Sequence, residues 1–180
     1  AERLRDPLYL GWRHERLTGT EYFDFVDRFV RAVKSELPNA CVQWEDFPNS
    51  IAYTLLTAYR DELLSFNDDI QGTAAVALAG LFSALRVSGG KLNDQRILFL
   101  GAGEAATGIA DLVVSAMMAE GASEAEALQR NWLVDSRGLV VRGRSGLSGH
   151  KLRYAHDHAE VADFATAINT LKPTAIIGVA

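Results

Sequence analysis

A glycine-rich turn between a predicted strand and a predicted helix constrains the fold of this chain most strongly. The apolar run at 96–100 predicts a buried strand, and helical spacing follows at about 104–119. The turn between them reads Gly101-Ala102-Gly103-Glu104-Ala105-Ala106. This is the pattern G-x-G-x-x-[G/A], whose small residues allow a tight turn, close approach of a pyrophosphate and close helix–strand packing. The sequence therefore predicts a dinucleotide-binding unit, and a turn without a ligand is the alternative.

The next predicted strand, 132–135, ends in Asp135, which we expect to bind a ribose hydroxyl of the dinucleotide. Asp135 lies further from Gly103 than the usual spacing of about 20 residues. An extra short helix, which the capping-box residues Ser123 and Glu126 predict, accounts for the difference.

The loop after Asp135 bears on the choice between NAD and NADP. Ser136 and Arg137 follow the aspartate directly, and Lys151 lies further along, together with Arg142 and Arg144. A 2′-phosphate needs a cation and hydroxyl donors, which these residues would supply. The alternative is that they are solvated cations of a loop.

The order of predicted elements indicates an α/β fold. Strands near 96–100, 132–135 and 174–179 alternate with helices near 104–119 and 161–171, as in a parallel sheet. We assign residues 73–180 to a partial Rossmann-type NAD(P)-binding domain with this sheet. Residues 1–72 are predicted to form part of a second α/β domain that carries a metal and substrate site, with helices near 21–36 and 50–64 and a strand near 40–44.

Two pairs of adjacent carboxylates stand out, Glu45-Asp46 at the end of a predicted strand and Asp68-Asp69 between two predicted helices. Bringing such pairs together is costly unless a cation neutralises them. Hard carboxylate oxygens suit Mg²⁺ or Mn²⁺. The alternative is that both pairs are solvated acidic turns.

Composition excludes several classes of function. The 180 residues are 48% hydrophobic with a net charge of −5, so we expect a globular domain and no nucleic-acid partner. No uninterrupted apolar run reaches the roughly 18 residues needed to span a bilayer, so we expect no membrane partner. The single cysteine, Cys41, cannot form an internal disulfide and is expected to be buried.

Several long motifs resemble the malic enzyme family, in order and over essentially the whole chain. They are Asp6-Pro7-Leu8-Tyr9-Leu10-Gly11, Gln43-Trp44-Glu45-Asp46-Phe47, Phe66-Asn67-Asp68-Asp69-Ile70-Gln71-Gly72-Thr73-Ala74, the glycine-rich turn, the segment 133–139 and the segment 172–180. The resemblance implies oxidation of malate with NAD(P) and decarboxylation to pyruvate, with Mn²⁺ or Mg²⁺. Malate and pyruvate are then the small-molecule partners.

The resemblance also implies roles for individual residues. Glu45, Asp46 and Asp69 would be the metal ligands, and Asp68 would hold and tune the catalytic lysine. Ser136 and Lys151 fall at or near the positions that favour NADP over NAD. The family further implies a dimer or tetramer. We expect a cytoplasmic protein, with a mitochondrial or plastid location as the alternatives.

Some family features have no counterpart in this sequence. The family's acid tyrosine, base lysine and a malate-binding arginine lie upstream of the metal motif, so none of these roles is assigned here. The chain starts without methionine and ends in what reads as a strand, so we expect a segment of a longer protein. Two alternatives remain: an NADP-binding module without turnover, and another metal-dependent decarboxylating dehydrogenase of 2-hydroxy acids.

Overall fold

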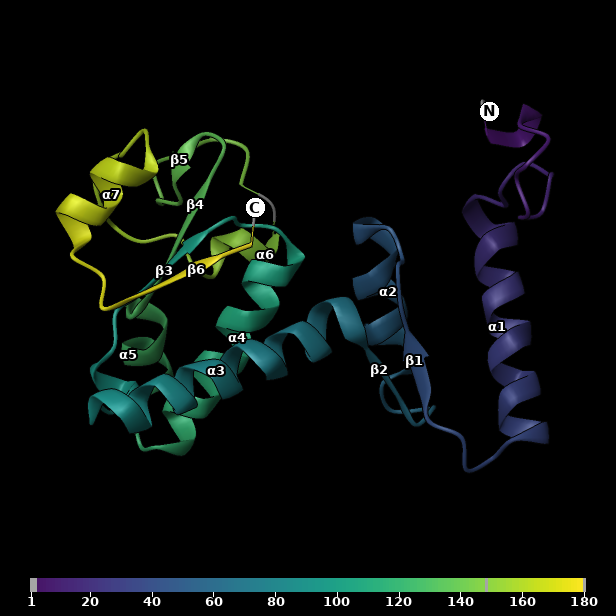
Figure 1. Ribbon diagram of the computed structural model, residues 1–180, viewed down its shortest axis with the longest axis horizontal. Coiled ribbons are helices and arrows are strands. Elements are labelled where there is room, and N and C mark those ends of the chain that lie inside the picture. Colours follow the sequence, from purple (N-terminus) through teal and green to yellow (C-terminus); the bar gives the residue numbers. More distant parts are fainter. Residues whose placement is uncertain (1–2, 148, 180) are drawn as a thin grey trace.

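The computed structural model describes residues 3–147 and 149–179. Two parts are joined by one long helix, as Figure 1 shows. The N-terminal part contains a two-stranded sheet and the C-terminal part a four-stranded sheet. This arrangement confirms the predicted α/β fold.

The N-terminal part consists of a 3₁₀ turn, two helices and two short strands. These are η1 (Arg3–Arg5), α1 (Gly19–Glu36), β1 (Val42–Trp44), α2 (Asn49–Tyr59) and β2 (Ser65–Asn67). β1 and β2 pair in parallel, with Trp44 opposite Asn67. Their core forms where Val26 and Val30 of α1 meet Trp44 and Leu55. The 3.6-residue spacing of the apolar side chains on α1 accounts for this packing.

The strand β2 was not expected from the sequence. Helical spacing predicted a helix to Leu64 followed by a polar segment, but α2 ends at Tyr59 and the chain becomes extended at Ser65. A three-residue strand carries almost no periodicity of its own. Its pairing with β1, which lies more than 20 residues earlier, stabilises it.

A π-helix, η2 (Asp68–Gly72), follows β2 directly and runs into α3 (Thr73–Ser88). Its wider turn is completed where the N–H of Thr73 donates to the carbonyl of Asp68. Single π-turns of this kind are rare in proteins, and those that occur often lie at functional sites. α3 is capped by Gly89, whose left-handed φ of 75° is typical of the residue that ends a helix.

The C-terminal sheet has the order β5-β4-β3-β6. Its strands are β3 (Ile97–Leu100), β4 (Asn131–Asp135), β5 (Gly138–Leu139) and β6 (Ala175–Gly178). β3, β4 and β6 are parallel, as predicted, and β5 returns antiparallel to β4. The remaining elements are η3 (Leu92–Asp94), α4 (Glu104–Ala119), α5 (Glu124–Gln129), α6 (Gly149–Leu152) and α7 (Phe164–Leu171). β5 and α6 lie in a segment predicted to be loop.

Alternation along β3 places a core on each face of this sheet. Ile97 and Phe99 pack with residues of α4, such as Val113, on one face. Leu98 faces the other side and packs in a cluster with Leu171 of α7. Fully burying a side chain of this size contributes roughly 1.5–3 kcal/mol each, so the two clusters hold α4 and α7 on opposite faces.

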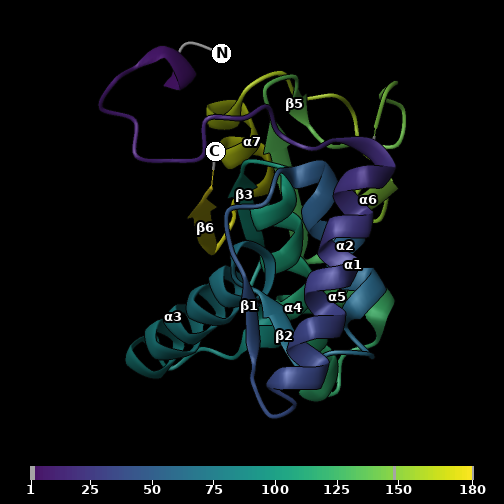
Figure 2. The same ribbon diagram turned by 90° about the vertical axis from the view of Figure 1, so that its right-hand side faces the viewer.

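Two surface features differ from expectation. Cys41 is exposed, because the strand begins one residue later, at Val42. The continuous helical segment Asp68–Ser88 is, by length and composition, able to cross a membrane, although its first residues are two aspartates. One side of α3 packs on α4 through Ala74 and its partly buried neighbours, while Val76 and Val87 are exposed. In Figure 2, α3 lies at the outer edge of the molecule.

Candidate functional site

The parallel pairing of β1 and β2 brings the two predicted acid pairs together. Because Trp44 lies opposite Asn67, Glu45-Asp46 and Asp68-Asp69 both leave the same edge of the small sheet. Carboxylate oxygens of Glu45, Asp46 and Asp69 lie within 4.8 Å of one another. A cluster of three carboxylates with hard oxygen donors fits Mg²⁺ or Mn²⁺.

The backbone around Asp46 shapes this cluster. Asp46 has a φ of 59°, in the left-handed region that non-glycine residues seldom adopt. Its N–H donates to Oδ2 of Asp69 over 3.1 Å, which joins the two strand ends. Gln43 donates from Nε2 to Glu45 over 3.1 Å and orients the third carboxylate.

The π-helix places Asp68 and Asp69 with the help of a buried asparagine. Asn67 is fully buried, and its Oδ1 accepts from the N–H of Ile70 over 2.9 Å. The N–H of Asn67 donates to Oε1 of Gln71. At Gly72 a Cβ would meet Oδ1 of Asp68, so the glycine leaves room for that carboxylate in its present orientation. The motif Asn-Asp-Asp-Ile-Gln-Gly is therefore one structural unit.

The close carboxylates affect the protonation of Glu45. The hydrogen bond from Gln43 lowers the pKa of Glu45, but partial desolvation and the nearby Asp68 and Asp69 raise it, and the net pKa lies above the ordinary value. Carboxylates crowded together resist ionisation because their negative charges repel. A divalent cation bound among them would favour the ionised form.

The glycine-rich turn has the backbone that a phosphate-binding turn requires. Gly101 has a φ of 124°, a backbone conformation that residues other than glycine rarely adopt. Gly103 is exposed and borders open space on the side where a Cβ would stand, so a ligand can approach its backbone. Ala106 is completely buried where α4 packs on β3. Glu104 and Ala105 begin α4, whose free N–H groups favour an anion.

The start of α4 also lies close to the acidic cluster. Burial raises the pKa of Glu104, and the neighbouring charge of Asp69 raises it further. One turn later, Gly108 packs against Ile70 of the π-helix, where a Cβ would lie 2.9 Å from the Ile70 carbonyl oxygen. This close approach brings the acidic cluster beside the glycine-rich turn.

Asp135 is held at the tip of the β4–β5 hairpin. Its Oδ1 accepts from the N–H of Arg137 over 2.9 Å, and its Oδ2 accepts from Arg144 and, over 3.0 Å, from Nζ of Lys151. Burial alone would raise the pKa of Asp135, but these hydrogen bonds outweigh it and lower the pKa to about 2. Ser136 is exposed beside them. The structure thus places Lys151 at the predicted ribose-binding aspartate, where it and Arg144 both pair with the carboxylate.

Three residues of the site were not found from the sequence. Asn67 and Gly108 act through packing and backbone contacts, which residue type alone does not indicate. Tyr53 joins α2 to α4 through a hydrogen bond to Thr107, 54 positions later. The motif around Asn67 was a usable signal, but Gly108 and Tyr53 lie in ordinary helical patterns.

Two protein-family models match this chain. The model described as "Malic enzyme, N-terminal domain" matches residues 1–60, and the model described as "Malic enzyme, NAD binding domain" matches residues 70–180. Among curated proteins, "NADP-dependent malic enzyme" of Homo sapiens is 52% identical over 180 residues, which are 99% of this chain and 32% of the relative. The human mitochondrial NADP-dependent malic enzyme is 50% identical over 99% of this chain and 30% of the relative. The chain therefore spans about a third of the length of these relatives.

Solved structures show the same fold. The Entamoeba histolytica malic enzyme superposes with a TM-score of 0.69 and 25% identity, over 87% of this chain and 32% of the other. An NAD-dependent malic enzyme from Thermotoga maritima gives a TM-score of 0.65 at 22% identity, over 86% of this chain and 40% of the other, which supports the fold alone. With family models covering both parts and relatives near 50% identity throughout, this chain belongs to the malic enzyme family.

Proposed function

We propose that this chain supplies the metal- and NADP-binding centre of an enzyme that oxidises malate and decarboxylates the product to pyruvate. The observation that carries the proposal is the parallel pairing of β1 and β2, which gathers Glu45, Asp46 and Asp69 within 4.8 Å beside the start of α4. The family relationship supports the choice of reaction, since the similar curated proteins are named NADP-dependent malic enzymes.

In this proposal Glu45, Asp46 and Asp69 hold Mn²⁺ or Mg²⁺. A divalent metal at such a site supplies Lewis-acid chemistry, polarising substrate oxygens and stabilising developing negative charge. Asp68, packed on Gly72 and close to Glu45, would orient the base of the reaction through a hydrogen bond. Gly101, Gly103 and the first turn of α4, including Glu104, Ala105 and Ala106, would receive the pyrophosphate of the dinucleotide.

NADP is proposed over NAD because of the surroundings of Asp135. A bare aspartate would repel a 2′-phosphate, but Arg144 and Lys151 both donate to Asp135 and offset its charge. Ser136 and Arg137 at the hairpin tip add a hydroxyl and a further cation. Cations and hydroxyl groups in this arrangement are the donors that a phosphate monoester prefers.

The proposal is tested first by binding. Isothermal titration of the chain with Mn²⁺, NADP and NAD should show metal binding that Asp69→Asn weakens and a preference for NADP that this variant retains. Reduced-nicotinamide production with malate, Mn²⁺ and NADP then tests turnover, with isocitrate in parallel. Binding of NADP without turnover would support the binding module, and turnover with isocitrate alone would support a different dehydrogenase of 2-hydroxy acids.

A further inference from the structure

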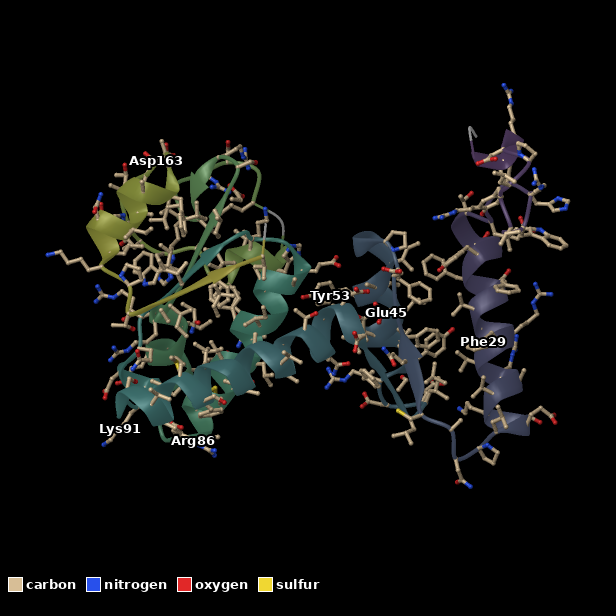
Figure 3. The ribbon with its side chains drawn as sticks, in the orientation of Figure 1. Phe29, Glu45, Tyr53, Arg86, Lys91 and Asp163 are labelled. Atoms are coloured by element: carbon tan, nitrogen blue, oxygen red, sulfur yellow. The ribbon has the colours of Figure 1, made fainter. Side chains whose placement is uncertain are left out.

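A tyrosine of the metal-carrying part contacts the first turn of α4, which follows the glycine-rich turn. Tyr53 lies on α2, and its Oη is 3.1 Å from Oγ1 of Thr107 in the first turns of α4. Thr107 is buried, with 1% of its surface exposed. Figure 3 shows Tyr53 where the two parts meet, near the acidic cluster labelled by Glu45. This hydrogen bond therefore joins the part that carries the carboxylates to the part that carries the glycine-rich turn.

The direction of this hydrogen bond follows from its neighbours. Oγ1 of Thr107 also lies 3.0 Å from the carbonyl oxygen of Gly103 and 3.2 Å from that of Glu104. Carbonyl oxygens only accept, and a threonine hydroxyl has one proton, so Thr107 donates to one of these carbonyls. Tyr53 must then donate its own proton to Thr107. A chain of two hydrogen bonds runs from Tyr53 through Thr107 to the backbone of the turn.

The ring of Tyr53 makes a second contact with the nucleotide-binding part. It stacks on the imidazole of His150, with ring centroids 6.1 Å apart and planes inclined by 15°. His150 is adjacent in sequence to Lys151, whose ammonium group donates to Asp135. One side chain of α2 thus reaches the turn at the proposed pyrophosphate site through Thr107 and contacts the helix that carries the proposed 2′-phosphate lysine.

We propose that Tyr53 is a positioning residue for NADP: it holds the Gly103 backbone and the helix α6 in place from the metal-carrying part. This inference rests on the proposed function, because it presumes that the chain binds NADP. A turn that is already ordered loses less conformational freedom when a ligand binds, which strengthens binding. Loss of one neutral hydrogen bond corresponds to a change of roughly two- to tenfold in an equilibrium constant.

The experiment measures NADP binding to the 180-residue chain by isothermal titration. Tyr53→Phe removes the hydroxyl and keeps the ring stack, and it should raise the dissociation constant for NADP roughly two- to tenfold. Thr107→Val should have a similar effect, and Thr107→Ser, which keeps a hydroxyl, should restore binding. The double variant Tyr53→Phe/Thr107→Val should bind no more weakly than Thr107→Val alone, because both changes remove the same chain of hydrogen bonds.

Tyr59→Phe is the matched control. Tyr59 lies on the same helix, but its ring stacks on Trp44, away from the turn, so NADP binding should not change. Thermal unfolding by circular dichroism establishes that each variant is folded at the titration temperature. If the unsubstituted chain does not bind NADP, the proposed function fails and this inference falls with it. If that chain binds NADP and Tyr53→Phe binds equally well, or if the effects of the two substitutions add, the role of Tyr53 alone is overturned.

Discussion

Replacing Gly108 by alanine places a methyl group at the contact between the two parts. Two effects compete. Alanine is the better helix former, by roughly 0.8–1 kcal/mol. Against this, the new Cβ would lie 2.9 Å from the carbonyl oxygen of Ile70 and 3.0 Å from its Cγ2. A backbone carbonyl cannot rotate away as a flexible side chain can, and overpacking of this kind costs roughly 1–3 kcal/mol. We expect the clash to win, with a net destabilisation of up to about 2 kcal/mol.

Gly80→Ala is the matched control, because Gly80 is an exposed glycine inside α3 with open space around its Cβ position. Helix propensity then acts alone, and the variant should be more stable than the parent by roughly 0.5–1 kcal/mol. The same substitution is therefore expected to have opposite signs at two helical positions. The difference isolates the contact between α4 and the π-helix.

Thermal unfolding followed by circular dichroism provides the assay. In a domain of this size, 1 kcal/mol shifts the midpoint by roughly 2–4 °C, so Gly108→Ala should lower Tm by up to about 8 °C and Gly80→Ala should raise it. Displacing Ile70 also displaces the adjacent Asp69, so Gly108→Ala should weaken Mn²⁺ binding in a titration, which Gly80→Ala should not. A Gly108→Ala protein as stable as the Gly80→Ala protein, with unchanged Mn²⁺ affinity, would refute the close contact.

Three further predictions follow from the site. Asp69→Asn should weaken Mn²⁺ binding at least about tenfold through loss of a charged oxygen ligand, with Asp61→Asn, an exposed acid outside the cluster, unchanged in the same titration. Lys151→Ala should weaken binding of NADP by roughly tenfold or more and of NAD much less, because only NADP offers a 2′-phosphate; equal losses would remove Lys151 from that role. The pKa of Asp135 is lowered from its ordinary 3.8 to about 2, so its stabilising effect is complete above pH about 4 and is lost as the pH falls toward 2. The urea midpoint of the parent chain should fall as the pH is lowered from 5 to 2, and part of this fall should be absent in Asp135→Asn. The same pH dependence in both proteins would contradict the ion pairs of Asp135.

The sequence by itself determined the elements whose signals are local. The run at 96–100, the glycine-rich turn and the apolar spacing that follows specify β3, the turn and α4, because backbone sterics and burial act within a few residues. The capping box at Ser123 is local for the same reason, and the structure confirms it. The two pairs of adjacent carboxylates indicated a candidate site for a divalent metal. The roles of the individual residues came from the family resemblance.

Only the tertiary structure decided what depends on contacts between distant segments. β2 is too short to be predicted from its own residues, yet its pairing with β1 sets Glu45 and Asp46 beside Asp69. Lys151 reaches Asp135 because the intervening loop folds back, which spacing along the chain does not indicate. The bond between Tyr53 and Thr107 likewise spans 54 residues. Periodicity and turn chemistry report on neighbours in sequence, whereas a site assembled from two sheets depends on the packing that brings their edges together.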